Sequence, residues 1–332
     1  MDLAYWLPLF FAGAMGLALL IYVLLDGYDL GIGMLLPFAT DDEKDVMVAA
    51  IGPFWDANET WIVLGVGILL IAFPQAHSIV LTSLYLPVTL MLMGLILRGV
   101  AFDFRVKAGD ARKAMWNRLF ALGSLVASVC QGWMVGAYVT GLTGDTTSTL
   151  FAAMIALTLP ALYIMLGAAW LLIKTEGDLF RKAIRWGRLA LFPMGAGLLL
   201  ISVATPLVSP AIAEKWFSLP NAIGLLPIPL TTAVAYAGLI WIFHSKQILF
   251  NGYGWLAFMA LTVICVLAGI GLGYSLFPDI IIGRLTLWES ASATESLLFT
   301  FWGAIVALPA IIGYTIFIYR VFRGKATALS YE

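Results

Sequence analysis

The chain alternates long apolar stretches with short polar connections. Each stretch holds roughly twenty residues, which is the length that a helix needs to cross a bilayer. Strands of a membrane barrel have about ten residues and alternate strictly between polar and apolar positions, and these stretches do neither. The pattern therefore predicts an all-α polytopic membrane protein with nine transmembrane helices, at residues 5–25, 54–73, 79–102, 119–140, 149–173, 187–206, 221–243, 253–277 and 297–319.

Three segments add detail to this prediction. Pro227 and Pro229 must break or kink the seventh span, because proline removes a backbone donor and clashes with the preceding turn. The connection 276–296 is long, and we expect it to lie along the membrane interface. The first stretch has no basic residue before it, so we expect it to be retained as a span and not removed as a signal peptide.

Composition agrees with a membrane protein. Hydrophobic residues make up 62% of the 332 positions, and charged residues only 11%, against roughly 25% in an ordinary soluble domain. A soluble fold could not cover so much apolar surface. The composition excludes a soluble enzyme, a disordered chain and a nucleic-acid binder, and it predicts one integral-membrane domain over residues 1–332.

Lysine and arginine predict the orientation, because basic residues concentrate on the cytoplasmic side. With nine alternating spans, fifteen of the 18 basic residues fall on one side, most of them in the connections 105–118 and 174–188. We therefore expect a periplasmic N-terminus and a cytoplasmic C-terminus.

Charges inside the spans are confined to one part of the sequence. A charge at the centre of a membrane helix costs at least ~2.5 kcal/mol, so each one needs a reason. The half at 1–140 carries these charges, and the half at 141–332 is apolar. The residues concerned are Asp26, Asp29, Asp56, Glu59, Arg98 and Asp103.

Each of these residues has a structural and a functional interpretation. Asp26 and Asp29 follow the first predicted span, where they form either a hydrated turn or a site with a partner; the glycines around them indicate a turn or close backbone packing. Asp56 and Glu59 share a helix face and either favour the helix N-terminus or lie one to two turns inside the membrane. Arg98 either extends to the interface or acts as counter-ion to Asp56 or Asp29.

Other residue types carry less chemistry. Trp55 and Trp61 are typical of interfacial anchors, and a cofactor contact is the less common alternative. The two histidines, His77 and His244, fall at span ends on opposite sides, so they cannot ligate one haem between them. No cysteine or histidine spacing supports a copper or zinc site.

Four sequence blocks resemble subunit II of the cytochrome bd-type quinol oxidases. They occur in the order of that family: Asp26-Gly-Tyr-Asp29-Leu-Gly-Ile-Gly33, Gly52-Pro-Phe-Trp-Asp-Ala-Asn-Glu-Thr-Trp61, Arg98-Gly-Val-Ala-Phe-Asp-Phe-Arg105 and Leu285-Thr-Leu-Trp-Glu-Ser-Ala-Ser292. The wording of the second block resembles the cyanide-insensitive branch.

The resemblance implies a fold of two four-helix bundles plus one additional helix, in the bacterial inner membrane. It implies a partner, subunit I, that holds haems b and d and the quinol site, while this chain binds no haem. Together they would reduce dioxygen to water with electrons from quinol and take protons from the cytoplasm. Some relatives also have a small single-span accessory subunit or a structural quinone.

The resemblance also implies roles for single residues. Asp56 and Arg98 are the first candidates for a proton pathway, Asp29 and Asp103 follow, and Asp26 and Glu59 come last.

In the same way, Trp55 and Trp61 are implied to lie at the subunit interface or near a haem.

Two other functions stay open at this point. One is a secondary transporter, although such proteins place their sites near the midplane in corresponding halves. The other is a purely structural scaffold subunit.

Overall fold

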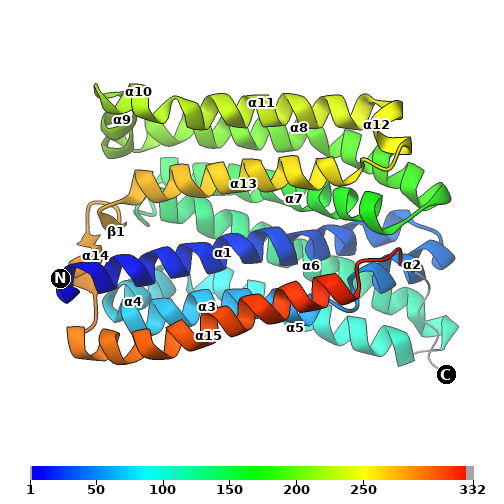
Figure 1. The fold of residues 1–332 in the computed structure, drawn as a ribbon, viewed down its shortest axis with the longest axis horizontal. Coiled ribbons are helices and arrows are strands. Elements are labelled where there is room, and N and C mark those ends of the chain that lie inside the picture. The colour runs from blue at the N-terminus through cyan, green and yellow to red at the C-terminus, as the bar shows by residue number, and fades with distance from the viewer. Residues whose placement is uncertain (1, 108, 327–332) are drawn as a thin grey trace.

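The protein is a bundle of long helices. The computed structural model describes residues 2–107 and 109–326, and in this part of the chain nine helices are long and apolar enough to cross a membrane. They run roughly parallel to the long axis of the molecule (Figure 1). This confirms the predicted all-α architecture with nine spans.

The first four long helices form one bundle. In it α1 packs on α3 and α6, and α5 packs on α6. Their bounds are α1 Leu3–Leu35, α3 Trp55–Ala72, α5 Tyr85–Lys107 and α6 Asp110–Val139.

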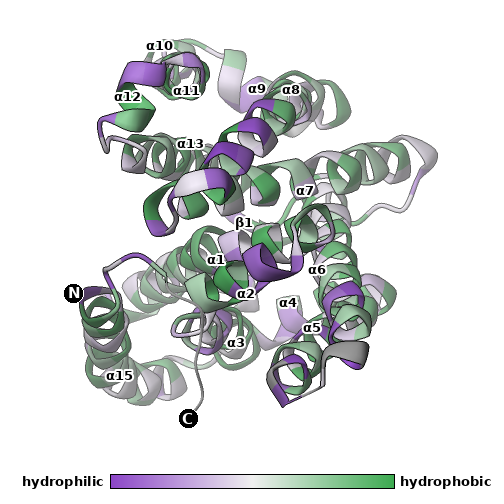
Figure 2. Ribbon diagram, turned by 90° about the vertical axis from the view of Figure 1, so that its right-hand side faces the viewer, coloured by the Kyte–Doolittle hydropathy of each residue, from purple (hydrophilic) through white to green (hydrophobic). Residues whose placement is uncertain are grey.

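The next four long helices form a second bundle, which shares the α1–α7 and α6–α7 contacts with the first. Viewed along the helices, the two groups lie one above the other (Figure 2). The bounds of the second group are α7 Thr146–Lys174, α8 Gly177–Val208, α11 Pro227–His244 and α13 Trp255–Leu276.

The ninth span lies outside both bundles. Helix α15 (Thr294–Val321) packs against α1, and most of its surface faces away from the rest of the chain. The predicted arrangement of two four-helix bundles plus one helix is confirmed.

Short elements join the spans. A two-stranded antiparallel hairpin pairs Asp279 with Thr286 and Ile281 with Leu285. The short elements are η1 Leu36–Phe38, α2 Asp41–Ile51, α4 Pro74–Ser83, α9 Pro210–Phe217, α10 Asn221–Leu225, α12 Lys246–Phe250, β1 Asp279–Ile281, β2 Leu285–Thr286 and α14 Leu287–Ser290.

Three predicted span boundaries can be compared with these helices. The first helix does not end at residue 25 but continues to Leu35. The third span begins at Tyr85 and not at 79, because α4 is a separate helix after Pro74. The seventh is broken as predicted, with α10 ending just before Leu226 and α11 beginning at Pro227.

Close packing of α1 on α7 joins the two bundles. A Cβ built on Gly31 would overlap the carbonyl oxygen of Tyr163, and one built on Gly167 would lie 2.7 Å from the backbone nitrogen of Ile32. Only glycine lets the two backbones approach so closely. The glycines after Asp26 therefore serve helix packing and do not form a turn, which decides between the two interpretations of the sequence.

Candidate functional site

Asp26 and Asp29 lie inside the helix and not after it. Both belong to α1, and both are fully buried. Of the two interpretations, the hydrated turn is wrong, because the apolar and glycine residues that follow continue the helix for more than a further turn against α7. The two carboxylates are consequently enclosed by protein toward one end of the bundle.

Arg98 is buried between these carboxylates and α3. Its side chain is 1% exposed, its Nη1 donates to Oδ1 of Asp26 at 2.6 Å, and its Nη2 donates to Oε2 of Glu59 at 2.9 Å. The expected counter-ions, Asp56 and Asp29, are not those that Arg98 contacts. The guanidinium instead joins α1, α3 and α5 in one ion-paired group, with two hydrogen bonds to charged acceptors.

Asp29 is held by an amide. Asn58, on α3, donates from Nδ2 to Oδ2 of Asp29 and to the hydroxyl of Tyr28, each at 2.8 Å. Its Oδ1 accepts from the Tyr319 hydroxyl at 3.0 Å, and the two tyrosine hydroxyls lie 2.6 Å apart. Asn58, Tyr28 and Tyr319 therefore close a hydrogen-bonded ring that ties the outer helix α15 to α1 and α3.

The buried group has more carboxylates than it has cations. Arg98 pairs with Asp26 and Glu59, and the nearby carboxylate of Asp29 is bound to the neutral amide of Asn58. Among the described residues, Oδ2 of Asp26, Oδ1 of Asp29 and Nε of Arg98 are buried without a hydrogen-bond partner. Buried polar atoms are nearly always bonded to protein or ordered water. The arrangement thus leaves two carboxylate oxygens free to exchange protons or to bind water.

Asp56 and Asp103 lie apart from this buried group. Both side chains are exposed on the surface of the chain, whereas Glu59 is 28% exposed. Glu59 therefore lies between the surface and the interior, bound to Arg98 on its inner side. The structure brings four of the six predicted ionisable residues together and leaves two at the surface.

The two tryptophans of this segment differ. Trp55 packs on Phe102, with ring centroids 4.9 Å apart, and is partly exposed. Trp61 is 2% exposed and packs with Ala18 and Tyr22 inside the chain. An interface position for Trp61 is wrong, because its ring is covered by helices of this chain, while Trp55 has free surface for a partner.

A second buried polar group surrounds Tyr22, which lies one helical turn before Asp26 on α1. Gln131, on α6, donates to the Tyr22 hydroxyl at 2.7 Å and accepts from the Tyr163 hydroxyl at 2.5 Å. Neither Gln131 nor Asn58 was singled out from the sequence. Their signal was a neutral amide in an otherwise apolar span, which is costly unless it is hydrogen-bonded.

Several charged residues at the same end of the bundle form salt bridges. Asp45 on α2 accepts from Arg105 at 2.6 Å and from Lys113 at 3.0 Å. Burial raises the pKa of Asp45, but the hydrogen bonds from Lys113 and Arg105 outweigh it, so the pKa of this carboxyl lies below its ordinary value. These salt bridges fix α2 over the end of the charged group.

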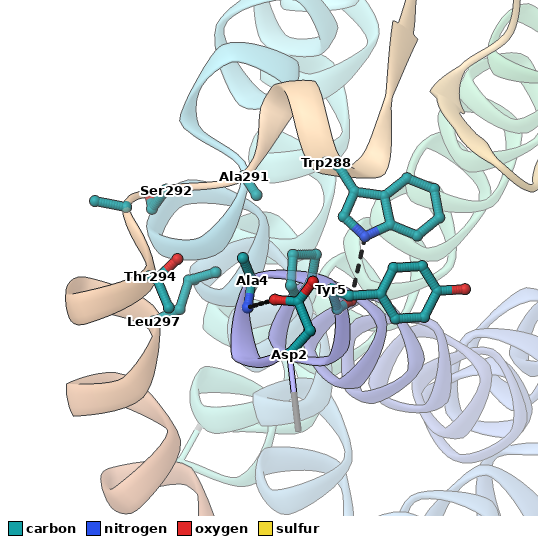
Figure 3. A pocket seen from close by; sticks show the side chains of 10 residues that line it. Asp2, Ala4, Tyr5, Trp288, Ala291, Ser292, Thr294 and Leu297 are labelled. Atoms are coloured by element: carbon teal, nitrogen blue, oxygen red, sulfur yellow. Dashed lines mark hydrogen bonds between the residues drawn. The ribbon is translucent and has the colours of Figure 1, made fainter.

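The opposite end of the bundle has a shallow pocket without comparable chemistry. It measures about 360 Å³ and lies between the start of α1 and the connection from α14 to α15 (Figure 3). Trp288 stacks on Tyr5 and donates to its carbonyl oxygen at 3.2 Å, while Asp2 caps α1. The pocket holds the N-terminus in place and brings no group of titratable side chains together.

Metal-binding residues are scattered in the part of the chain that the structure describes. No group of three or more histidine, cysteine or carboxylate side chains there could hold a metal ion. His77 belongs to α4 and His244 ends α11, and these elements reach opposite ends of the bundle (Figure 1). The two imidazoles are therefore unable to bind one haem from both sides.

Comparison with known proteins covers nearly the whole chain. The family model for cytochrome bd terminal oxidase subunit II matches residues 7–322. Cytochrome bd ubiquinol oxidase subunit 2 of Bacillus subtilis is 26% identical, over 92% of this chain and 93% of that protein. Cytochrome bd-I ubiquinol oxidase subunit 2 of Escherichia coli K12 is 25% identical, over 94% of this chain and 93% of that protein.

The fold has a counterpart among solved structures. A chain from the structure of the bd oxidase from Geobacillus thermodenitrificans superposes with a TM-score of 0.77 at 16% identity, covering 95% of this chain and 98% of that one. At this identity the likeness concerns the fold alone, whereas the family assignment rests on the sequence. The chain belongs to the cytochrome bd terminal oxidase subunit II family.

Proposed function

We propose that this chain is the haem-free subunit of a membrane-bound quinol:dioxygen oxidoreductase, and that it brings protons from the cytoplasm toward haems b and d held by subunit I. The names of its relatives support the quinol oxidase activity. The positions of the two histidines support placing the haems in the partner, since this chain offers no pair of imidazole ligands. The specific resemblance to the cyanide-insensitive branch stays a prediction.

The buried group of Asp26, Asp29, Glu59 and Arg98 carries this proposal. Ionisable side chains inside a membrane protein are expensive and typically mark proton or ion pathways. Three carboxylates close to one guanidinium, two of them with an oxygen that has no hydrogen-bond partner among the described residues, form a group that can take up and release protons. A scaffold alone would need no such excess of carboxylates.

The exposed carboxylates support a route from the surface. Asp56 and Asp103 lie on the surface of membrane-spanning helices, where contact with lipid would be unfavourable. A partner subunit packed against α3 and α5, or a water-filled path along these helices, would keep the two carboxylates out of lipid. We propose that protons pass from this face to Glu59 and then to the group around Arg98.

Orientation and location follow the same proposal. Most of the basic residues that predicted a cytoplasmic side lie in the last turn of α5, the first turns of α6, the end of α7 and the first turns of α8. By the positive-inside rule we place this end of the bundle in the cytoplasm, in the bacterial inner membrane. Entry from the cytoplasm then coincides with the end at which the charged group lies.

The test uses the purified complex of this chain with its haem subunit. Asp56→Asn and Asp29→Asn are expected to retain the haem spectrum and to lower quinol oxidase turnover roughly tenfold or more, the scale of losing one positioned proton-transfer group. Asp42→Asn, a change of an exposed residue on α2, serves as the matched control and is expected to keep full turnover.

Three results would contradict the proposal. Full turnover of an assembled Asp56→Asn and Asp29→Asn complex would exclude the proton role. Loss of the haem subunit from both variants would instead favour a scaffold. Solute uptake by this chain alone in liposomes would favour a transporter.

A further inference from the structure

Three buried polar side chains form an arm beside the charged group. Tyr22 on α1, Gln131 on α6 and Tyr163 on α7 are 3%, 6% and 0% exposed. The Tyr163 hydroxyl donates to Oε1 of Gln131 at 2.5 Å, and Nε2 of Gln131 donates to the Tyr22 hydroxyl at 2.7 Å. The arm crosses from the second bundle to the first through the packed interior.

The amide gives this arm a direction. A side-chain amide accepts only at its oxygen and donates only at its nitrogen. Because Tyr163 occupies the oxygen of Gln131, the nitrogen faces Tyr22, whose oxygen becomes the acceptor. The proton of the Tyr22 hydroxyl must therefore point elsewhere, toward another acceptor.

Asp26 offers an acceptor one helical turn away. It follows Tyr22 by four residues on α1, so the two side chains are neighbours on one face of the helix. Arg98 occupies Oδ1 of Asp26, and Oδ2 is a buried atom without a partner among the described residues. A buried acceptor without a donor is costly, and Tyr22 is placed to remove this cost.

We propose that Tyr22 is a positioning residue for Asp26, and that Gln131 sets the direction in which its hydroxyl donates. Asp26 is then held from two sides, by the Arg98 guanidinium and by the Tyr22 hydroxyl. The arm does not conduct protons, since the amide nitrogen of Gln131 cannot accept one. The inference rests on the proposed proton function of Asp26 and deepens it.

The other groups around Asp26 do not replace this donor. Arg98 approaches from α5 and is bound to Glu59 of α3 as well. Asp29, the next carboxylate on α1, is an acceptor, and its donor is Asn58. The other titratable neighbours among the described residues are Tyr163 on α7, whose proton is directed to Gln131, and Tyr319 on α15, whose proton is directed to Asn58.

The decisive variant is Tyr22→Phe in the intact complex with the haem subunit. It removes one hydroxyl and keeps the ring. We expect unchanged haem content and quinol KM, a two- to tenfold lower kcat, and a pH–rate profile displaced by about one unit toward alkaline pH. A carboxylate that loses a hydrogen-bond donor gives up its proton only at higher pH, and one bond to a charged group has this magnitude.

The matched control is Tyr236→Phe. This hydroxyl also lies in a span and donates to the carbonyl oxygen of Leu191 at 2.8 Å, away from the charged group. We expect it to leave kcat and the pH–rate profile at the wild-type values.

Gln131→Met gives a second, independent measurement. It keeps the Tyr22 hydroxyl but no longer fixes the direction in which this hydroxyl donates. We therefore expect the pH–rate profile to move in the same direction as in Tyr22→Phe, but by less. If Tyr22→Phe fails to assemble with the haem subunit, the profile of Gln131→Met decides.

The outcomes separate this inference from the proposed function. Wild-type profiles of Tyr22→Phe and Gln131→Met, beside a slow Asp29→Asn, would overturn the positioning role and leave the proton function standing. Wild-type behaviour of assembled Asp29→Asn and Asp56→Asn as well would overturn both. A displaced profile in Tyr236→Phe equal to that of Tyr22→Phe would also overturn the positioning role.

Discussion

Gly31→Ala tests the close approach of α1 and α7. The new Cβ would overlap the Tyr163 carbonyl oxygen and lie 2.6 Å from its carbonyl carbon and 3.1 Å from the Gly167 nitrogen. Since these atoms belong to the backbone of α7, no side chain can move aside, and the helices must separate. Overpacking costs about 1–3 kcal/mol or more, against a gain of at most about 1 kcal/mol from helix propensity.

At the upper end of the overpacking range, the expected net loss in the free energy of unfolding is about 2 kcal/mol. At the roughly 2–4 °C per kcal/mol of a large domain, it corresponds to a fall of roughly 4–8 °C in the midpoint of heat-induced unfolding. The measurement is the temperature at which the purified complex in detergent loses its monodisperse peak in size-exclusion chromatography. Gly16→Ala on the same helix is the matched control, because a Cβ there meets nothing within 4 Å. An unchanged midpoint for Gly31→Ala, or an equal fall for Gly16→Ala, would refute the reasoning.

Three further changes test other parts of the structure. Arg98→Met alone leaves buried carboxylates unpaired and is expected to cost about 3–5 kcal/mol and most of the assembled complex, whereas Arg98→Met with Asp26→Leu should recover assembly, measured as haem content, without recovering turnover. Tyr319→Phe removes two hydrogen bonds at about 1 kcal/mol each, and the unfolding midpoint is expected to fall by several degrees. Because the pKa of Asp45 is lower in the folded than in the unfolded chain, its salt bridges stabilise the folded state at pH values above about 3.9, and this stabilisation is lost as the pH falls through the lower pKa of the folded state. Asp45→Asn should therefore flatten the fall in thermal stability below about pH 5.

The spans could be predicted because their signal is physical and local. A run of twenty apolar residues has few alternatives to a membrane helix, and a proline inside such a run predicts a break that the structure places between α10 and α11 at Leu226. The end of α1 could not be predicted in this way. Asp26 and Asp29 look like the polar end of a span, and only the contact with α7 shows that the helix continues.

The ion pairs among the charged side chains could not be predicted from the sequence, for a different reason. Spacing places Asp56 and Glu59 within one turn of α3, but it does not say which helix each side chain faces. Glu59 turns inward to Arg98, while Asp56 remains on the surface. Neutral amides such as Asn58 were missed because a search for charges passes over them, although burial makes their hydrogen bonds equally specific.

The glycine contacts and the buried charges depend on one another. Tyr163 lies against Gly27, the residue next to Asp26, and a Cβ on Gly27 would lie 2.9 Å from that ring. The absence of side chains on this face of α1 lets α7 cover the carboxylates and exclude bulk water. In such an interior a charge interacts more strongly with the few groups it touches than it would at the surface. Each hydrogen bond to Asp26, Asp29 and Arg98 therefore has a larger effect on the proton affinity of the group than a surface contact would have. For this reason the neutral side chains that hold the carboxylates are as informative to mutate as the carboxylates themselves.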